Sequence, residues 1–388
     1  MVSVGHAYLD IALRLRRLVP DWVDSYAGPP ELAAAVEAQA TDSVRELGAR
    51  VDEVAARVTR EVAQPDRRRW LLAQLSGIAT ALRWLDGERP AYTDLFERCH
   101  GATVERVADA QFEQAHALLD RALPGVGDVA ARYRAWRETQ LVPRDHLQAG
   151  IDVLAGEMRR RSDEHFDLPA DEEVMWELVT DEPWAGYADY LGRRRSRIRI
   201  NVDLPIGGFR LLELVCHEAY PGHHSEHACK EANLVGREGC EELLVFVYPT
   251  PQPVMAEGLA CCAVGALLGD QADRVAATCL AQAGVSYDHE TAAGIREAQE
   301  LLLPVRSNIV LMLDDGASAR QARDYAREWL LEDAELIDKI IDALDGRSWR
   351  PYESCYSVGL ALCRQYMSSG RGSFHHLLHG QLTPADLQ

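Results

Sequence analysis

The segment LVCHEAYPGHHSEH, residues 214–227, gathers four histidines and two glutamates within fourteen positions. His217 and Glu218 follow the strongly apolar stretch RLLELVC, so they enter the buried end of a predicted helix. A buried imidazole beside a buried carboxylate is costly unless something pairs with both groups. A divalent cation is a common partner for that combination of side chains. The segment therefore predicts a metal site.

The position of the second imidazole ligand depends on the Pro221-Gly222 pair. In an undistorted helix two metal ligands stand at i and i+4 on one face, but Pro221 occupies that place after His217. If Pro-Gly loops out of the helix as a two-residue insertion, His223 takes the i+4 position, and we prefer it. His224 is the alternative, because i+7 returns to the same face two turns on. A polar helix face accounts for the remaining polar residues, which are Glu226, His227 and Glu231.

A third protein ligand is expected from a later helix, because catalytic zinc commonly holds three protein ligands and keeps a fourth position open. Glu257 is the single acid in PVMAEGLACCAVGALLG, residues 253–269. A lone carboxylate on so apolar a helix is costly unless it is paired. The alternative interpretation is a first-turn glutamate stabilised by the helix dipole. We predict one zinc ion per chain, bound by His217, His223 and Glu257.

The elements that must position these residues are mostly helices. Amphipathic spacing predicts helix after helix from residue 31 to about 165, the first covering residues 31–63 and ending before Pro65. Alternating apolar and polar residues predict strands at 172–180 and 196–205, separated by a turn-rich aromatic segment. Helices resume at residue 209. We expect a mainly α fold with a small β-sheet beside the metal-binding helix.

Two regions are expected along the chain: an N-terminal helical region, 1–168, and a catalytic metal-binding region, 169–388. One compact unit with a cleft is the alternative. The sequence shows no linker of low complexity between them.

Composition restricts the partners and the compartment. The formal net charge of −20 argues against nucleic acid or an anionic membrane surface as a partner. The N-terminal residues lack the pattern of a signal peptide, and no uninterrupted apolar run reaches the roughly 18 to 20 residues of a membrane span. Nine cysteines without framework spacing indicate free thiols. We expect a cytoplasmic protein.

Several of these segments resemble a known family. HEAYPGHH followed by AEGLA resembles the H-E-x-x-P-G-H-H and E-G-W-A elements of the bacterial DUF885 family, gluzincin-like zinc metallopeptidases. RSNIVLMLDDGASARQARDYAREW and CYSVGLAL resemble later segments of the family, in the same order. The resemblance covers about residues 170–365. The chain departs from the family pattern at Leu259, where the family has tryptophan, and at Ile309 and Leu313.

The resemblance implies a zinc-dependent hydrolase of peptide or amide bonds with a multi-helix gluzincin-like fold. It implies Glu218 as the general base, rotated about 100° from its neighbour His217 around the helix. Tyr356 and Arg306 would contact the substrate, and either could stabilise the oxyanion. We further expect SRIRINVD, residues 196–203, to form an edge strand that pairs with an extended substrate.

Two other classes of function share the proposed ligands. Two histidines and one carboxylate also form the non-haem iron triad of oxidoreductases, which leaves Glu218 without a role. A catalytically silent metal-binding protein has no need of an acid directly beside His217. We therefore favour the hydrolase, with a peptide or an amide-containing small molecule as its partner.

Overall fold

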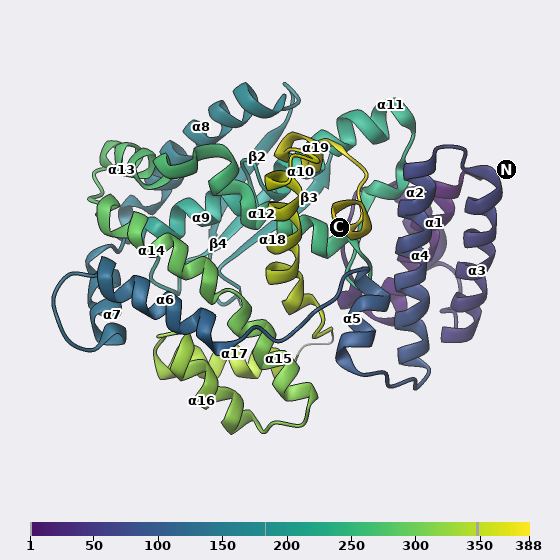
Figure 1. The fold of residues 1–388 in the computed structure, drawn as a ribbon. Coiled ribbons are helices and arrows are strands. Elements are labelled where there is room, and N and C mark those ends of the chain that lie inside the picture. The colour runs from purple at the N-terminus through teal and green to yellow at the C-terminus, as the bar shows by residue number, and fades with distance from the viewer. Residues whose placement is uncertain (1, 183, 347–348) are drawn as a thin grey trace.

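A computed structural model of the chain describes residues 2–182, 184–346 and 349–388. Helices dominate it, which confirms the mainly α fold (Figure 1). The helices before residue 170 are α1 (Val4–Leu18), α2 (Pro30–Glu37), α3 (Val44–Glu61), α4 (Pro65–Leu85), α5 (Tyr92–His100), α6 (Asp109–Ala122), α7 (Val129–Thr139) and α8 (Leu147–Phe166). The later helices are α9 (Gly208–Glu218), α10 (His223–Lys230), α11 (Gly236–Glu238), α12 (Gln252–Leu268), α13 (Ala272–Gln282), α14 (His289–Leu302), α15 (Pro304–Asp314), α16 (Ala319–Trp329), α17 (Ala334–Gly346), α18 (Tyr352–Ser368), α19 (Phe374–His379) and α20 (Pro384–Leu387).

The stretch predicted as one helix over residues 31–63 is two helices, α2 and α3. Ser43 begins α3 with a capping box, in which its hydroxyl accepts from the Glu46 N–H and the Glu46 carboxylate accepts from the Ser43 N–H. This local exchange of hydrogen bonds outweighs the continuous apolar spacing. α3 ends at Glu61, and Pro65 is the first residue of α4. At that position the missing N–H of proline has no helical acceptor to lose.

Three strands form the sheet, in the order β2 (Glu173–Val179), β4 (Arg195–Asn201), β3 (Gly186–Gly192). β2 runs parallel to β4 and β3 antiparallel to it. Ile198 and Ile200 of β4 are fully buried. A separate antiparallel pair joins β1 (Val23–Tyr26) to β5 (Val245–Val247).

The sheet corrects two expectations. The segment 181–192, expected to be a turn-rich connection, contains β3, whose sequence GYADYLG has no β-branched residue to signal a strand. SRIRINVD was expected at the edge of the sheet, and this is wrong, because β4 is paired on both sides. The alternation of apolar and polar residues in a segment predicts a strand and its buried face. It does not predict which strands lie beside it, because those strands come from distant parts of the chain.

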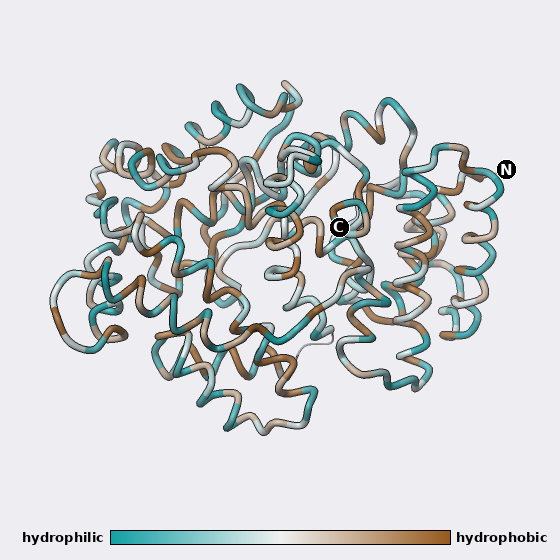
Figure 2. Tube along the Cα trace, viewed as in Figure 1, coloured by the Kyte–Doolittle hydropathy of each residue, from teal (hydrophilic) through white to brown (hydrophobic). Residues whose placement is uncertain are grey.

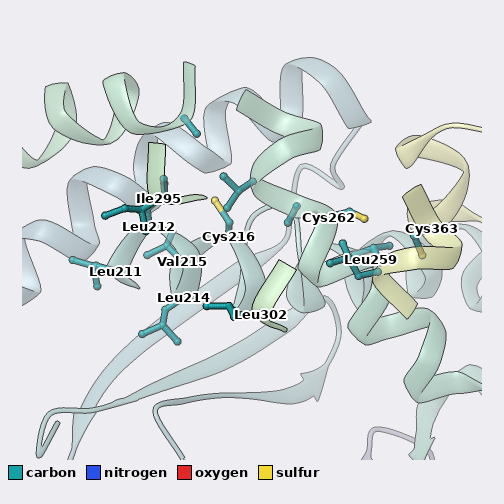
Figure 3. Packing of buried hydrophobic residues seen from close by; sticks show 14 of the residues in the cluster. Leu211, Leu212, Leu214, Val215, Cys216, Leu259, Cys262, Ile295, Leu302 and Cys363 are labelled. Atoms are coloured by element: carbon teal, nitrogen blue, oxygen red, sulfur yellow. The ribbon is translucent and has the colours of Figure 1, made fainter. Parts of the chain in front are cut away.

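Buried apolar side chains form two clusters. The smaller draws on α1, α3, α4 and part of α5, and adds Val245, Val247 and Trp349 from later in the chain. The larger contains most of the other buried apolar residues, those of α6 to α8 included. Figure 3 shows part of it, where α9, α12 and α18 meet. The apolar core thus divides near residue 100, and the domain boundary at residue 168 stays a prediction.

α12 is the most apolar of the described helices and lies near the centre of the molecule (Figure 1), where hydrophobic residues are drawn in brown in Figure 2. Within the described residues, the segment Gln252–Gln282 is long and apolar enough to cross a membrane by length and composition, but 78% of its apolar window is buried inside the protein. Packing in the core accounts for its composition. The absence of a membrane partner stays a prediction.

α12 and α18 touch backbone to backbone. A Cβ atom placed on Gly258 would lie 2.4 Å from the carbonyl of Gly359, and one placed on Gly359 would lie 2.2 Å from the carbonyl oxygen of Val254. Glycine at both positions is therefore what allows the two helices to cross this closely. The crossing sets Glu257, the residue before Gly258, beside the first turns of α18.

We expect Gly359→Ala to destabilise the protein by about 1–3 kcal/mol or more, because a backbone contact cannot yield to the added methyl group as a side chain would. Gly265→Ala on α12 is the matched control: its Cβ would meet no atom within 4 Å, so it should be neutral or stabilise by about 0.5–1 kcal/mol. Urea unfolding measures both. Equal effects of the two substitutions would contradict the close crossing.

Candidate metal centre

The helix that carries the histidines is broken where the sequence predicts. α9 ends at Glu218, the Tyr220–Pro221 peptide bond is cis, and α10 begins at His223. A Cβ atom on Gly222 would lie 1.9 Å from the carbonyl oxygen of His217, so only glycine fits at that point of the loop. The loop returns the chain onto the end of α9. It places the His223 ring 4.7 Å from the His217 ring, centroid to centroid.

His217, His223 and Glu257 come together. Each offers one ligand atom, and these three atoms lie within 4.8 Å of one another. Glu257 Oε2 is 3.3 Å from His217 Nε2 and 3.7 Å from His223 Nε2. Ligand atoms about 2 Å from a tetrahedral ion stand roughly 3.3 Å apart, so these separations suit one ion.

The electrostatic state of the cluster also fits a cation. Glu257 is only 2% exposed, and its Oε2 has no hydrogen-bond partner among the described residues. Burial raises the pKa of Glu257 and lowers the pKa of both His217 and His223. Burial thus disfavours charge on all three groups, and a divalent metal, which binds neutral imidazoles and a carboxylate oxygen, would supply the compensating charge. The three residues therefore fit zinc, while the identity of the metal stays a prediction.

His224, the alternative ligand, has other partners. It is fully buried, with Nδ1 2.8 Å from Ser196 Oγ and Nε2 2.7 Å from Glu172 Oε2. Glu172 also accepts hydrogen bonds from the Tyr220 hydroxyl at 2.7 Å and from Arg159 Nε at 2.5 Å. His224 thus ties α10 to the sheet, and the geometry favours His223 as the ligand.

Glu218 is 7% exposed and lies against the start of β3. A Cβ atom on Gly186 would be 3.4 Å from both Cγ and Oε1 of Glu218. Burial raises the pKa of Glu218, and the nearby His217 opposes that shift. No hydrogen bond or ion pair of this carboxylate is found in the described parts of the chain. Glu218 is thus a second buried acid near Glu257, and none of the described residues forms a hydrogen bond or ion pair with its carboxylate.

Two tyrosines of α18 complete this side of the cluster. The Tyr356 ring lies 6.2 Å from the His217 ring and nearly parallel to it, at 16°. The Tyr352 hydroxyl donates a hydrogen bond to Glu257 Oε1, the oxygen that does not face the histidines. Sequence reasoning missed Tyr352. Its signal was the spacing, because it precedes Tyr356 by four residues on one helix face.

Arg306 is not brought into the cluster. Its Nε lies 2.6 Å from Glu353 Oε1, and its Nη2 donates to Glu353 Oε2 at 3.2 Å, which joins α15 to α18. The arginine whose charge acts on His217 and Glu218 is Arg210. Between the two oxyanion candidates, Tyr356 is therefore the one placed beside the histidines.

Comparisons with known proteins show the fold alone. No family model matches the chain, and no curated protein matches it. A solved structure that resembles it is described as "a putative lipoprotein of unknown function from Shewanella oneidensis"; it shares 14% sequence identity and a TM-score of 0.50, over 92% of this chain and 71% of the other. The likeness to the DUF885 family stays a prediction.

We expect His217→Ala and His223→Ala to abolish zinc binding, because each removes one of three ligands. His224→Ala should keep close to one zinc per chain but lose about 1–3 kcal/mol of stability, since it leaves buried Glu172 short of a hydrogen bond. Metal analysis after dialysis against zinc, together with urea unfolding, distinguishes the two histidines. Full zinc in His223→Ala and none in His224→Ala would reverse the assignment.

Proposed function

We propose that the protein is a zinc-dependent hydrolase of peptide or amide bonds. The observation that supports this most is Glu218, a second buried carboxylate beside the cluster of His217, His223 and Glu257. A purely structural metal site needs no such acid, and an iron oxidoreductase site leaves it without a role. A hydrolase uses one acid as a ligand and the other as a base.

His217, His223 and Glu257 would hold the ion, and the Tyr352 hydroxyl orients the Glu257 carboxylate through Oε1. Zinc in such a site supplies a water of lowered pKa and a Lewis acid for the scissile carbonyl. Glu218 takes the proton from the attacking water and passes it to the leaving amine.

Two further parts of the chain contribute to the reaction. Tyr356, stacked near His217, donates a hydrogen bond to the oxyanion as negative charge develops on it. β3 is an edge strand whose first residue lies against Glu218, so it takes the substrate-pairing role first expected of residues 196–203. An extended peptide paired there would run past the general base.

Glu218→Gln tests the function directly. The amide keeps the shape of the side chain but cannot accept a proton, so we expect zinc content to stay unchanged while hydrolysis of a peptide library falls about 10²- to 10⁴-fold. A chelator should abolish wild-type activity and added zinc should restore it. Undiminished turnover in Glu218→Gln would exclude Glu218 as the base, and metal-dependent oxygen consumption without hydrolysis would favour the iron oxidoreductase.

Tyr356→Phe should lower kcat with little change in KM, because the hydrogen bond to the oxyanion forms only in the transition state. The expected increase of the barrier is about 2.7–4 kcal/mol, the range for one lost oxyanion donor. Tyr366→Phe is the matched control, since Tyr366 lies on the same helix with its hydroxyl 2.6 Å from His376 Nδ1. A rise of KM alone in Tyr356→Phe would make this residue part of the substrate-binding wall.

A further inference from the structure

Asp24 of β1 brings the N-terminal part of the chain to the candidate metal centre. Its Oδ1 accepts two hydrogen bonds, from the Tyr187 hydroxyl at 2.7 Å and from the Tyr248 hydroxyl at 2.5 Å. The two tyrosines come from different elements, β3 and the segment after β5. Asp24 is half-buried, and its Oδ2 is not among the fully buried oxygens that lack a partner.

Both tyrosines lead from Asp24 to residues of the metal centre. The Tyr248 ring lies 4.7 Å from the Tyr352 ring, and Tyr352 donates to Glu257. On the other side, Tyr187 follows Gly186, which lies against Glu218. The charge of Asp24 also acts on His223. Asp24 is therefore linked through Tyr187 and Tyr248 to residues beside Glu218 and Glu257.

Asp24 lacks the cationic partner that other acids near the site have. Asp189 is paired with Arg197 at 2.5 Å and Glu226 with Lys230 at 2.5 Å. In the described residues no lysine or arginine forms an ion pair with Asp24, and the charged groups that act on it include His223, Asp189, Glu218 and Glu257. Burial raises its pKa despite the two tyrosine donors. A largely desolvated carboxylate without a cationic partner is stabilised when a ligand supplies the cation.

We propose that Asp24 binds the positively charged amino group of the substrate, so that the enzyme acts on peptides with a free amino end. The inference rests on the proposed hydrolase function and specifies its substrate class. Recognition of a carboxyl end would require a free cation instead, and Arg306 and Arg210 are already paired, with Glu353 and Glu213 respectively. The net charge of −20 attracts cationic ligands in the same sense.

A purely structural role for Asp24 makes a different prediction. As a link that ties β1 to β3 and to the segment after β5, Asp24 needs only an oxygen that accepts two hydrogen bonds. Asparagine keeps such an oxygen and removes the charge. Asp24→Asn therefore separates the structural role from recognition of an ammonium group.

The experiment uses the zinc-loaded full chain and a library of random hexapeptides, either with free amino ends or N-acetylated, with products read by mass spectrometry. The wild type should cleave the free-amine library faster, near the amino end. Asp24→Asn should lose about 10- to 100-fold on that library, as expected for one charged hydrogen-bond partner, and little on the acetylated one. Asp109→Asn on α6 is the matched control, because Asp109 Oδ1 also accepts a tyrosine hydroxyl, that of Tyr325 at 2.8 Å, outside the candidate site; it should keep the preference.

A binding measurement separates failure of this inference from failure of the proposed function. Ultrafiltration of the same libraries with zinc-loaded Glu218→Gln protein should retain free-amine peptides over acetylated ones, and adding Asp24→Asn should remove that enrichment. No enrichment, or an equal loss on both libraries in Asp24→Asn, would overturn the role of Asp24. Enrichment without hydrolysis by the wild type would support Asp24 and reject the hydrolase.

Discussion

A carboxylate in an apolar helix is the constraint around which the centre of this molecule is arranged. Glu257 lies on α12, the most apolar helix of the core, and one of its oxygens has no partner among the described residues. Removing that charge from water is unfavourable unless other groups compensate. Two features of the backbone bring those groups close to Glu257. The Gly258–Gly359 contact places the Tyr352 hydroxyl beside it, and the Pro-Gly break after α9 brings His223 next to His217.

The adjacent histidines of the PGHH segment have separate tasks. Because successive residues of a helix point about 100° apart, His223 faces Glu257 while His224 faces the sheet. The bonds of His224 to Ser196 and Glu172 hold the first turn of α10, and Arg159 and Tyr220 hold Glu172 in turn. A buried network whose members all have partners holds the neighbouring His223 in place.

The N-terminal part of the chain reaches the same place. β1 comes from the N-terminal part and pairs with β5, which leads into α12. Through this pairing, Asp24 reaches the tyrosines that border the metal centre. The N-terminal helices support a segment that borders the candidate site, so the site is built from both parts of the chain.

Residue types and local spacing were sufficient to predict part of the fold and part of the candidate site. His217, Glu218 and Glu257 stood out because charged groups in apolar helical patterns are costly wherever the chain goes, and Gly222 and Pro221 break a helix by their own geometry. The mainly α fold followed from the same local periodicity. Other features depend on segments distant in sequence, including the central place of β4, the strand β3, the pairing of Arg306 with Glu353, and the positions of Tyr352 and Asp24. Pairing and proximity of that kind arise from packing between elements, which a local pattern does not encode, so only the tertiary structure decided them.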